Sequence, residues 1–156
     1  MRRKDREITD IHKIEEILAG ARYLHLGVFD GEYPYVVPLH YGYVMENEKL
    51  TFYVHCAKEG HKLDCIRRNN RVFVEIDCGE KLIAADIPCQ YGAEYASVMG
   101  RGEATILQDV KDKCEALRIL MKTQTGEDYE MNEEMADAVT VIRIKVDSYT
   151  AKARVR

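Results

Sequence analysis

Short connections between strand-like segments place the strongest constraint on how this chain folds. The segments 22–29, 34–44 and 50–56 show the alternation, or the β-branched and aromatic content, that is typical of strands. Only four or five residues separate each segment from the next. Because a parallel pair needs a crossover of a dozen or more residues, these strands are expected to pair antiparallel.

Over the whole chain, predicted strands outnumber predicted helices. Three further strands are predicted, at 71–77, 96–107 and 139–146. Three helices are predicted from apolar residues at helical spacing, at 10–20, 57–70 and 109–122. A short helical turn is predicted within 131–138, and 78–92 shows no clear pattern. The predicted fold class is mainly β (α+β), a six-stranded antiparallel barrel with about three peripheral helices, in one domain over 1–156.

Single residues mark several of these boundaries. Asp10 is predicted to cap the first helix, and Asp30-Gly31 is a dipeptide typical of hairpin turns. Pro38 has no N–H to donate, so its strand is expected at a sheet edge or a bulge. Gly100 and Gly102 predict a bulge in a long strand.

Charge and cysteine content narrow the functional classes. The net charge of −4 argues against a general nucleic-acid-binding protein, which would carry an excess of basic residues. No apolar run approaches the ~20 residues of a membrane span, and the polar start does not resemble a signal peptide. The five cysteines form an odd set without a C-x-x-C pair, which predicts a cytoplasmic chain with reduced thiols.

The segment 52–62, FYVHCAKEGHK, predicts an anion site. A strand ends there, the chain turns at Gly60, and a helix begins with His61 and Lys62. A helix start offers free N–H groups and partial positive charge, and glycine lets an anion approach the backbone. A solvated helix start with an exposed lysine explains the same residues equally well.

The histidines suggest acid–base chemistry more than metal binding. His55, Cys56 and His61 do not follow the paired spacing of zinc ligands, and His55 and Cys56 should point to opposite faces of a strand. No metal site is therefore predicted. His25 is interpreted as a satisfied polar core residue. His40 and His55 are the candidate catalytic residues, because an unperturbed histidine titrates near neutrality.

Four segments in this order resemble a known family. They are MRRKDREITD (1–10), PYVVPLHYGY (34–43), FYVHCAKEGHKLDCIRRNNRVFVEID (52–77) and EYASVMGRGEATIL (94–107). Together they resemble the FMN-binding split barrel of pyridoxamine 5′-phosphate oxidase-like proteins, and within it the nitroimidazole-resistance (Nim) subgroup. The resemblance covers nearly the whole chain. It implies a homodimer with FMN at the subunit interface.

The resemblance also implies a set of cofactor-binding residues. The strand 35–41 would lie along the flavin ring, while Gly60, His61 and Lys62 would hold the phosphate. Ser97 and Val98 would approach the ring from the partner subunit. The implied set is Val37, Pro38, Leu39, His40, Tyr41, His55, Gly60, His61, Lys62, Ser97 and Val98.

The function that the resemblance implies is that of an FMN-dependent oxidoreductase. Such an enzyme would use NAD(P)H to reduce an electron-poor small molecule of the nitroimidazole or nitro-aromatic type. A non-enzymatic flavin- or haem-binding module is the alternative from another class. Pyridoxamine-phosphate oxidase activity is disfavoured, because the chain lacks the arginine- and histidine-bearing tail with which that enzyme grips its substrate.

Overall fold

A computed structural model describes residues 3–154; the first two residues of the segment 1–10 and the last two of the predicted domain 1–156 lie outside the described residues. The strands are β1 (Glu7–Ile8), β2 (Leu24–Phe29), β3 (Pro34–Leu39), β4 (Tyr41–Glu46), β5 (Lys49–Cys56), β6 (Arg71–Ile83), β7 (Gly92–Ile106) and β8 (Thr140–Arg154). The helices are α1 (Ile11–Gly20), α2 (His61–Arg68), α3 (Val110–Thr125) and α4 (Glu133–Asp137), with 3₁₀ turns η1 (Lys4–Arg6) and η2 (Pro88–Gln90).

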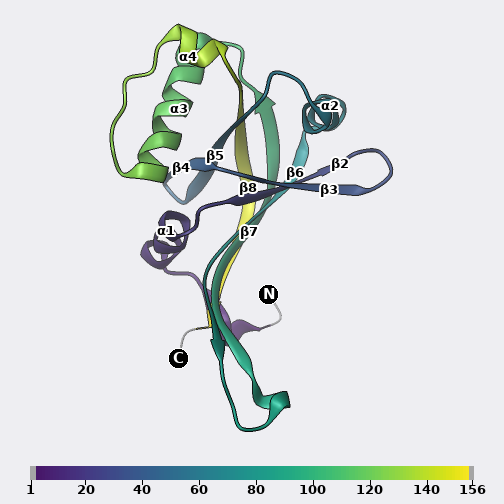
Figure 1. The fold of residues 1–156 in the computed structure, drawn as a ribbon, viewed down its shortest axis with the longest axis vertical. Helices are drawn as coiled ribbons and strands as arrows, with labels where there is room; N and C mark the ends of the chain where they lie inside the picture. The colour runs from purple at the N-terminus through teal and green to yellow at the C-terminus, as the bar shows by residue number, and fades with distance from the viewer. Residues whose placement is uncertain (1–2, 155–156) are drawn as a thin grey trace.

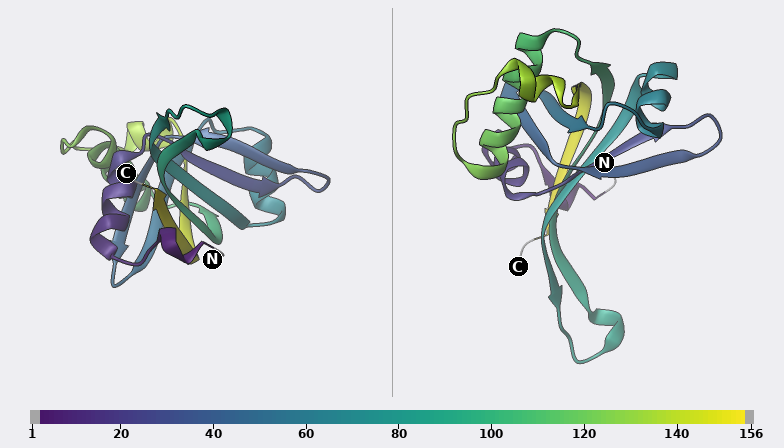
Figure 2. Two further views of the ribbon diagram at one scale, coloured as in Figure 1. Left: turned by 90° about the horizontal axis from the view of Figure 1, so that it is seen from below. Right: turned by 45° about the horizontal axis from the view of Figure 1, so that its top comes forward.

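All eight strands belong to one antiparallel sheet, and the two strands at its edges follow each other directly in the chain. The strand order is β3-β2-β6-β7-β8-β5-β4, and β1 pairs with β8. The edge strands β3 and β4 are separated in sequence by His40 alone. Since consecutive Cα atoms lie about 3.8 Å apart, the sheet must curl until the ends of its two edges nearly meet. Figures 1 and 2 show this curled, incompletely closed sheet, which confirms the predicted split-barrel fold class.

The predicted single strand at 34–44 is wrong in one respect. The chain changes pairing partner at His40, so that β3 pairs with β2 while β4 pairs with β5. The β-branched and aromatic pattern continues through this point, so periodicity alone gave no sign of the break. This break and the short β1 raise the strand count from the predicted six to eight.

Most local predictions are confirmed by the backbone. The Asp10 carboxylate accepts from the N–H of His12 at 3.0 Å and caps α1. Pro38 lies in an edge strand, and the pairing of β7 with β8 shifts register between Arg101 and Gly102. The Asp30-Gly31 pair does connect a hairpin, but in a longer loop, closed by a 3.0 Å bond from the N–H of Asp30 to the carbonyl of Tyr33.

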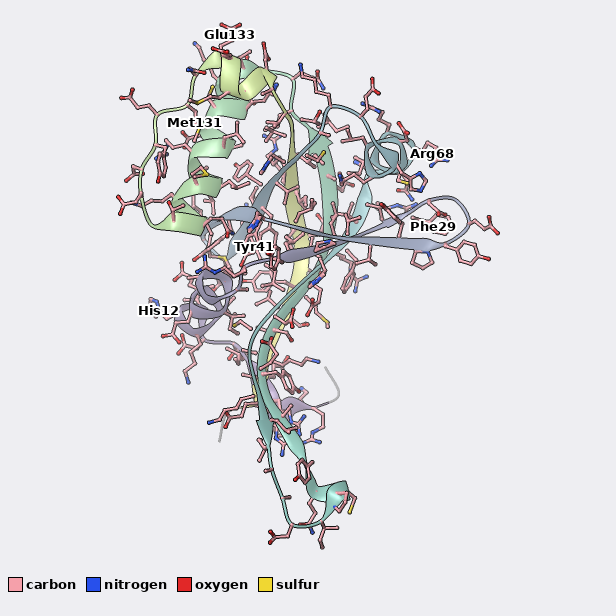
Figure 3. The ribbon with its side chains drawn as sticks, in the orientation of Figure 1. His12, Phe29, Tyr41, Arg68, Met131 and Glu133 are labelled. Carbon is pink, nitrogen blue, oxygen red and sulfur yellow. The ribbon has the colours of Figure 1, made fainter. Side chains whose placement is uncertain are left out.

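The main core fills the barrel and is closed by helices. Leu63 and Ile66 of α2 insert into it, and so does Leu18 of α1. Tyr41, near the centre of Figure 3, is fully buried and donates its hydroxyl to the Leu18 carbonyl at 2.6 Å. A second, smaller cluster packs α3 and α4 against the outer side of the sheet around Val141. None of the helices among residues 3–154 has the length and apolar character to span a membrane.

A substitution at Gly42 should separate α3 from the barrel. A Cβ at Gly42 would lie 2.5 Å from the backbone nitrogen of Leu120, so the helix backbone would have to move. Overpacking of this kind costs about 1–3 kcal/mol, and Gly42→Ala should lower the melting temperature measurably. In the control Gly20→Ala, the new Cβ would meet only the Cys78 sulfur at 3.6 Å. Equal melting temperatures for the two variants would contradict the close packing.

The pattern-free segment 78–92 forms a projecting arm. There β6 and β7 continue as a two-stranded ribbon beyond the barrel, with η2 at its tip (Figure 1). A register shift between Cys78 and Lys81 interrupts the pairing. Leu82, Ile87 and Tyr91 are exposed there. Of residues 78–92 only Ile83 is buried, and a segment that buries so little of its surface shows no alternation in its sequence.

Candidate functional site

The start of α2 has the form of an anion cradle. Gly60 precedes the helix with φ 146° and ψ 159°, and among the described residues no side chain caps this helix start. A Cβ at Gly60 would meet nothing within 4 Å, so the space beside the backbone is open. The positive φ favours glycine. An open glycine next to the positive end of a helix dipole is suited to a phosphate group.

His61 joins this helix start to the β2–β3 hairpin. Its ring packs edge-on against Tyr35, with the ring centroids 4.9 Å apart, and its Nε2 lies 3.8 Å from the Asp30 carboxylate. The backbone N–H groups of Tyr33 and Glu32, and then His61, lower the pKa of Asp30. The start of β3 is therefore held beside the anion cradle.

Lys62 supplies a cation at the same place. Burial raises the pKa of the Cys56 thiol, and Lys62 opposes that rise, which places its ammonium group near the sulfur. Within residues 3–154, Lys62 forms no ion pair with a carboxylate. Its charge is therefore available to an anion.

The free edge of β3 leads away from this cradle. Because β3 pairs only with β2, alternate backbone groups along its other side are unpaired. Val37 and Leu39 are half-buried and Pro38 is exposed. The side chain of Tyr41 points into the core, so the strand offers its backbone and its short apolar side chains along this edge.

His40 and His55 lie near each other at the far end of this edge. Burial, and then the neighbouring His40, lowers the pKa of His55. The His55 Nδ1 is buried and has no hydrogen-bond partner among the described residues. His40 contacts the Gln124 side-chain oxygen through Nδ1 at 3.2 Å, and its ring lies 4.8 Å from that of Tyr23. The pair therefore offers an orphaned nitrogen atom beside the β3 edge.

The lowered pKa of His55 predicts a pH effect on stability. An unfolded histidine has a pKa of about 6.5, so as the pH falls the unfolded chain takes up this proton before the folded chain does. The contribution of His55 to the free energy of unfolding should therefore be fully present above about pH 6.5. It should be lost as the pH falls towards the lower pKa that His55 has in the folded protein. His55→Gln should show a smaller loss of melting temperature between about pH 7 and pH 5. An unchanged pH slope in this variant would count against the burial of His55.

Ser97 and Val98 do not join the other predicted residues within one chain. They lie on β7, three strands away from β3 in the sheet, which corresponds to about 14 Å. Val98 points into the core, whereas the buried Ser97 hydroxyl has no partner among the described residues.

Several residues at this site were not predicted from the sequence. Tyr35 and Asp30 hold His61, and Gln124 binds both His40 and the Tyr41 carbonyl, the latter at 2.7 Å. Gln124 lies 84 residues from His40 in the chain, near the end of α3. No local pattern signals such a contact.

The outer face of β2, β3 and β6 carries an exposed apolar patch, here called the outer patch. It surrounds an open hollow of about 470 Å³ whose lining includes Phe29, Val36 and Phe73. Val36 is 57% exposed and Phe73 is 50% exposed. Contiguous apolar surface of this kind marks an interaction site.

Comparison with known proteins identifies the family. Residues 10–153 match the family model described as pyridoxamine 5′-phosphate oxidase. The chain belongs to this family. A comparison with curated proteins found no match.

Several solved structures are similar to this chain along most of its length. A candidate 5-nitroimidazole antibiotic resistance protein of Bacteroides thetaiotaomicron is 34% identical, with a TM-score of 0.80, over 94% of this chain and 86% of that one. The flavocytochrome Anf3 of Azotobacter vinelandii is 18% identical, with a TM-score of 0.79, over 100% and 72%. A FAD- and haem-binding protein of Mycobacterium smegmatis is 13% identical, with a TM-score of 0.81, over 97% and 74%. The latter two share the fold, which thus serves flavin- and haem-binding proteins.

Proposed function

We propose that the chain is a homodimeric, FMN-dependent oxidoreductase that uses NAD(P)H to reduce electron-poor small molecules of the nitroimidazole or nitro-aromatic type. One observation carries this proposal: an uncapped glycine helix start is linked by a free strand edge to a pair of histidines. A bound flavin would supply the redox chemistry, and the protein would supply position and electrostatics.

The anion cradle fits the phosphate of FMN. Gly60 allows close approach to the backbone, Lys62 supplies a cation that has no carboxylate partner within the described part of the chain, and His61 adds a side-chain donor. A phosphate at a helix start also gains from the helix dipole. These three residues would therefore fix one end of the cofactor.

The β3 edge fits the flavin ring. Its unpaired backbone groups would bond the polar ring edge, and Val37, Pro38 and Leu39 would present apolar surface. His40 would approach through its ring. The orphaned Nδ1 of His55 would gain a partner in the bound state, where it would hold or transfer a proton.

A second copy of this chain is the proposed occupant of the outer patch. The exposed apolar side chains and the projecting arm give each protomer surface that its own core does not cover. Subunit contact there would also bring the backbone at Ser97 and Val98 of the partner subunit towards the flavin, while the Val98 side chain stays in its own core. The 34% identity to a nitroimidazole-resistance protein supports nitroimidazoles and related nitro compounds as the electron acceptors.

Anaerobic reduction tests this function. NADH or NADPH should bleach the absorbance of protein-bound FMN, and a nitroimidazole should restore it without oxygen. Free FMN at the same concentration is the control. A bound flavin that neither nucleotide reduces would contradict the enzyme and favour a carrier. Turnover of pyridoxamine phosphate, with no reaction towards nitro compounds, would contradict the acceptor class.

A further inference from the structure

Three potential metal ligands meet on the outer face of β2 and β6. His25 lies directly opposite Glu75 in the antiparallel pairing, and Asp77 follows two residues later on β6. Because side chains alternate along a strand, all three point to the same face. The His25 Nδ1 lies 3.1 Å from the Glu75 carboxylate and 3.8 Å from the Asp77 carboxylate. One ligand atom from each residue lies within 4.8 Å of the others.

A simple hydrogen bond does not account for this cluster. A single Nδ1–H donates well to one carboxylate, yet this nitrogen faces two. Two carboxylates therefore share one imidazole. Lys152 also acts on Glu75, more weakly than His25 does. The ligand set therefore has acceptor capacity that the chain itself leaves unused.

The buried Ser97 hydroxyl is a second, independent observation. Ser97 lies directly opposite Asp77 in the pairing of β6 with β7, so its side chain is on the same face as the cluster. The residue is only 4% exposed, and its Oγ has no partner among residues 3–154. A water molecule held by the cluster would give this oxygen the bond that it lacks.

We propose that His25, Glu75 and Asp77 bind a divalent first-row transition-metal ion. With ligands at about 2.1 Å, tetrahedral or octahedral geometry separates two ligand atoms by about 3.0–3.4 Å. The 3.1 Å distance from His25 to Glu75 lies in this range, and the Asp77 carboxylate, at 3.8 Å, would have to move slightly closer. One imidazole and two carboxylates suit ions such as Zn²⁺ and Mn²⁺. Three protein ligands leave positions open for water, next to Ser97.

In the single chain the cluster is also accessible from solvent, since the three side chains are 26–44% exposed. His25 is thus not a core residue, which corrects its interpretation from the sequence. It borders the hollow of the outer patch and a second hollow beside Asp77 that contains none of Phe29, Val36 and Phe73. A metal ion can therefore enter through the second hollow in the proposed dimer as well. The prediction of no metal site considered only the spacing of ligands along the chain, which cannot reveal a site built across two strands.

Metal titration of the purified full chain tests this site independently of the flavin. Mn²⁺ should be the first probe, because thiolates from the five cysteines bind softer metals in preference to Mn²⁺. Electron paramagnetic resonance measures the concentration of the free ion. One ion per chain should bind, and Zn²⁺ should bind more tightly than Mn²⁺. His25→Ala and the nearly isosteric Asp77→Asn should each weaken binding by about tenfold or more.

His12→Ala is the matched control. His12 lies on α1 (Figure 3), where it faces Glu15 at 3.7 Å, and no third ligand joins them among the described residues. This variant should bind Mn²⁺ as the unaltered protein does. Thermal melting would show that the variants are folded. No saturable binding up to about 1 mM, or equal affinity in Asp77→Asn and the unaltered protein, would overturn the proposal.

Discussion

Replacing Lys62 with alanine is expected to weaken FMN binding by roughly ten- to a hundredfold. The phosphate of FMN carries up to two negative charges, and the chain is acidic overall, with a net charge of −4. Binding therefore depends on local positive charge, and Lys62 provides it without a competing carboxylate within residues 3–154. A hydrogen bond to a charged group contributes about 1.5–3 kcal/mol, which sets the size of the effect.

Riboflavin and a neighbouring lysine provide the controls. Riboflavin has the ring but no phosphate, so it should bind the unaltered protein and Lys62→Ala almost equally. Lys58→Ala removes an exposed lysine from the same connection and should change FMN affinity much less. Both ligands should be titrated at one salt concentration. If Lys62→Ala weakened riboflavin as much as FMN, Lys62 would act on the fold or the ring instead of the phosphate.

Replacing Phe73 with aspartate should separate the proposed dimer. Phe73 is half-exposed in the single chain, so a carboxylate there remains solvated and the barrel should still fold. In a dimer that covers the outer patch, the same carboxylate would lose its water while Arg71 and Arg101 lie beside it on the same face. Desolvation of the carboxylate, which these cations offset only in part, together with the lost apolar contact of the ring, should weaken the dimer by about tenfold or more. FMN affinity should fall with it, because the flavin site is proposed to be shared.

Sedimentation and FMN titration measure these two effects together. Tyr129→Asp is the matched control, since Tyr129 is also exposed but belongs to the connection from α3 to α4. Figure 1 shows this connection across the molecule from the β2–β3 hairpin. It should remain dimeric and bind FMN normally. In the unaltered protein, excess FMN should raise the melting temperature by mass action. A Phe73→Asp protein that stays dimeric, or an FMN-loaded monomer at micromolar concentration, would contradict the proposed interface.

Local chemistry made much of this fold predictable. The Asp10 cap and the edge position of Pro38 each follow from the chemistry of one residue. The anion cradle was predictable for the same reason, because a glycine before a helix start is a local feature.

Contacts across the sheet were not predictable in this way. The break at His40 depends on which strand each half pairs with, and the contact of His40 with Gln124 joins residues 84 positions apart. The cluster of His25 with Glu75 depends on the register between β2 and β6. Such features arise from tertiary pairing, and neither alternation nor spacing along one strand encodes them.

The cofactor that co-purifies with the protein tests the central claim most directly. Its absorbance spectrum should be recorded on the native protein and again on the ligand released by denaturation. The proposed function predicts a yellow protein with a flavin spectrum that releases FMN, one per chain, and that rebinds added FMN saturably. A red protein with a haem Soret band, or a colourless one that fails to bind added FMN, would contradict it.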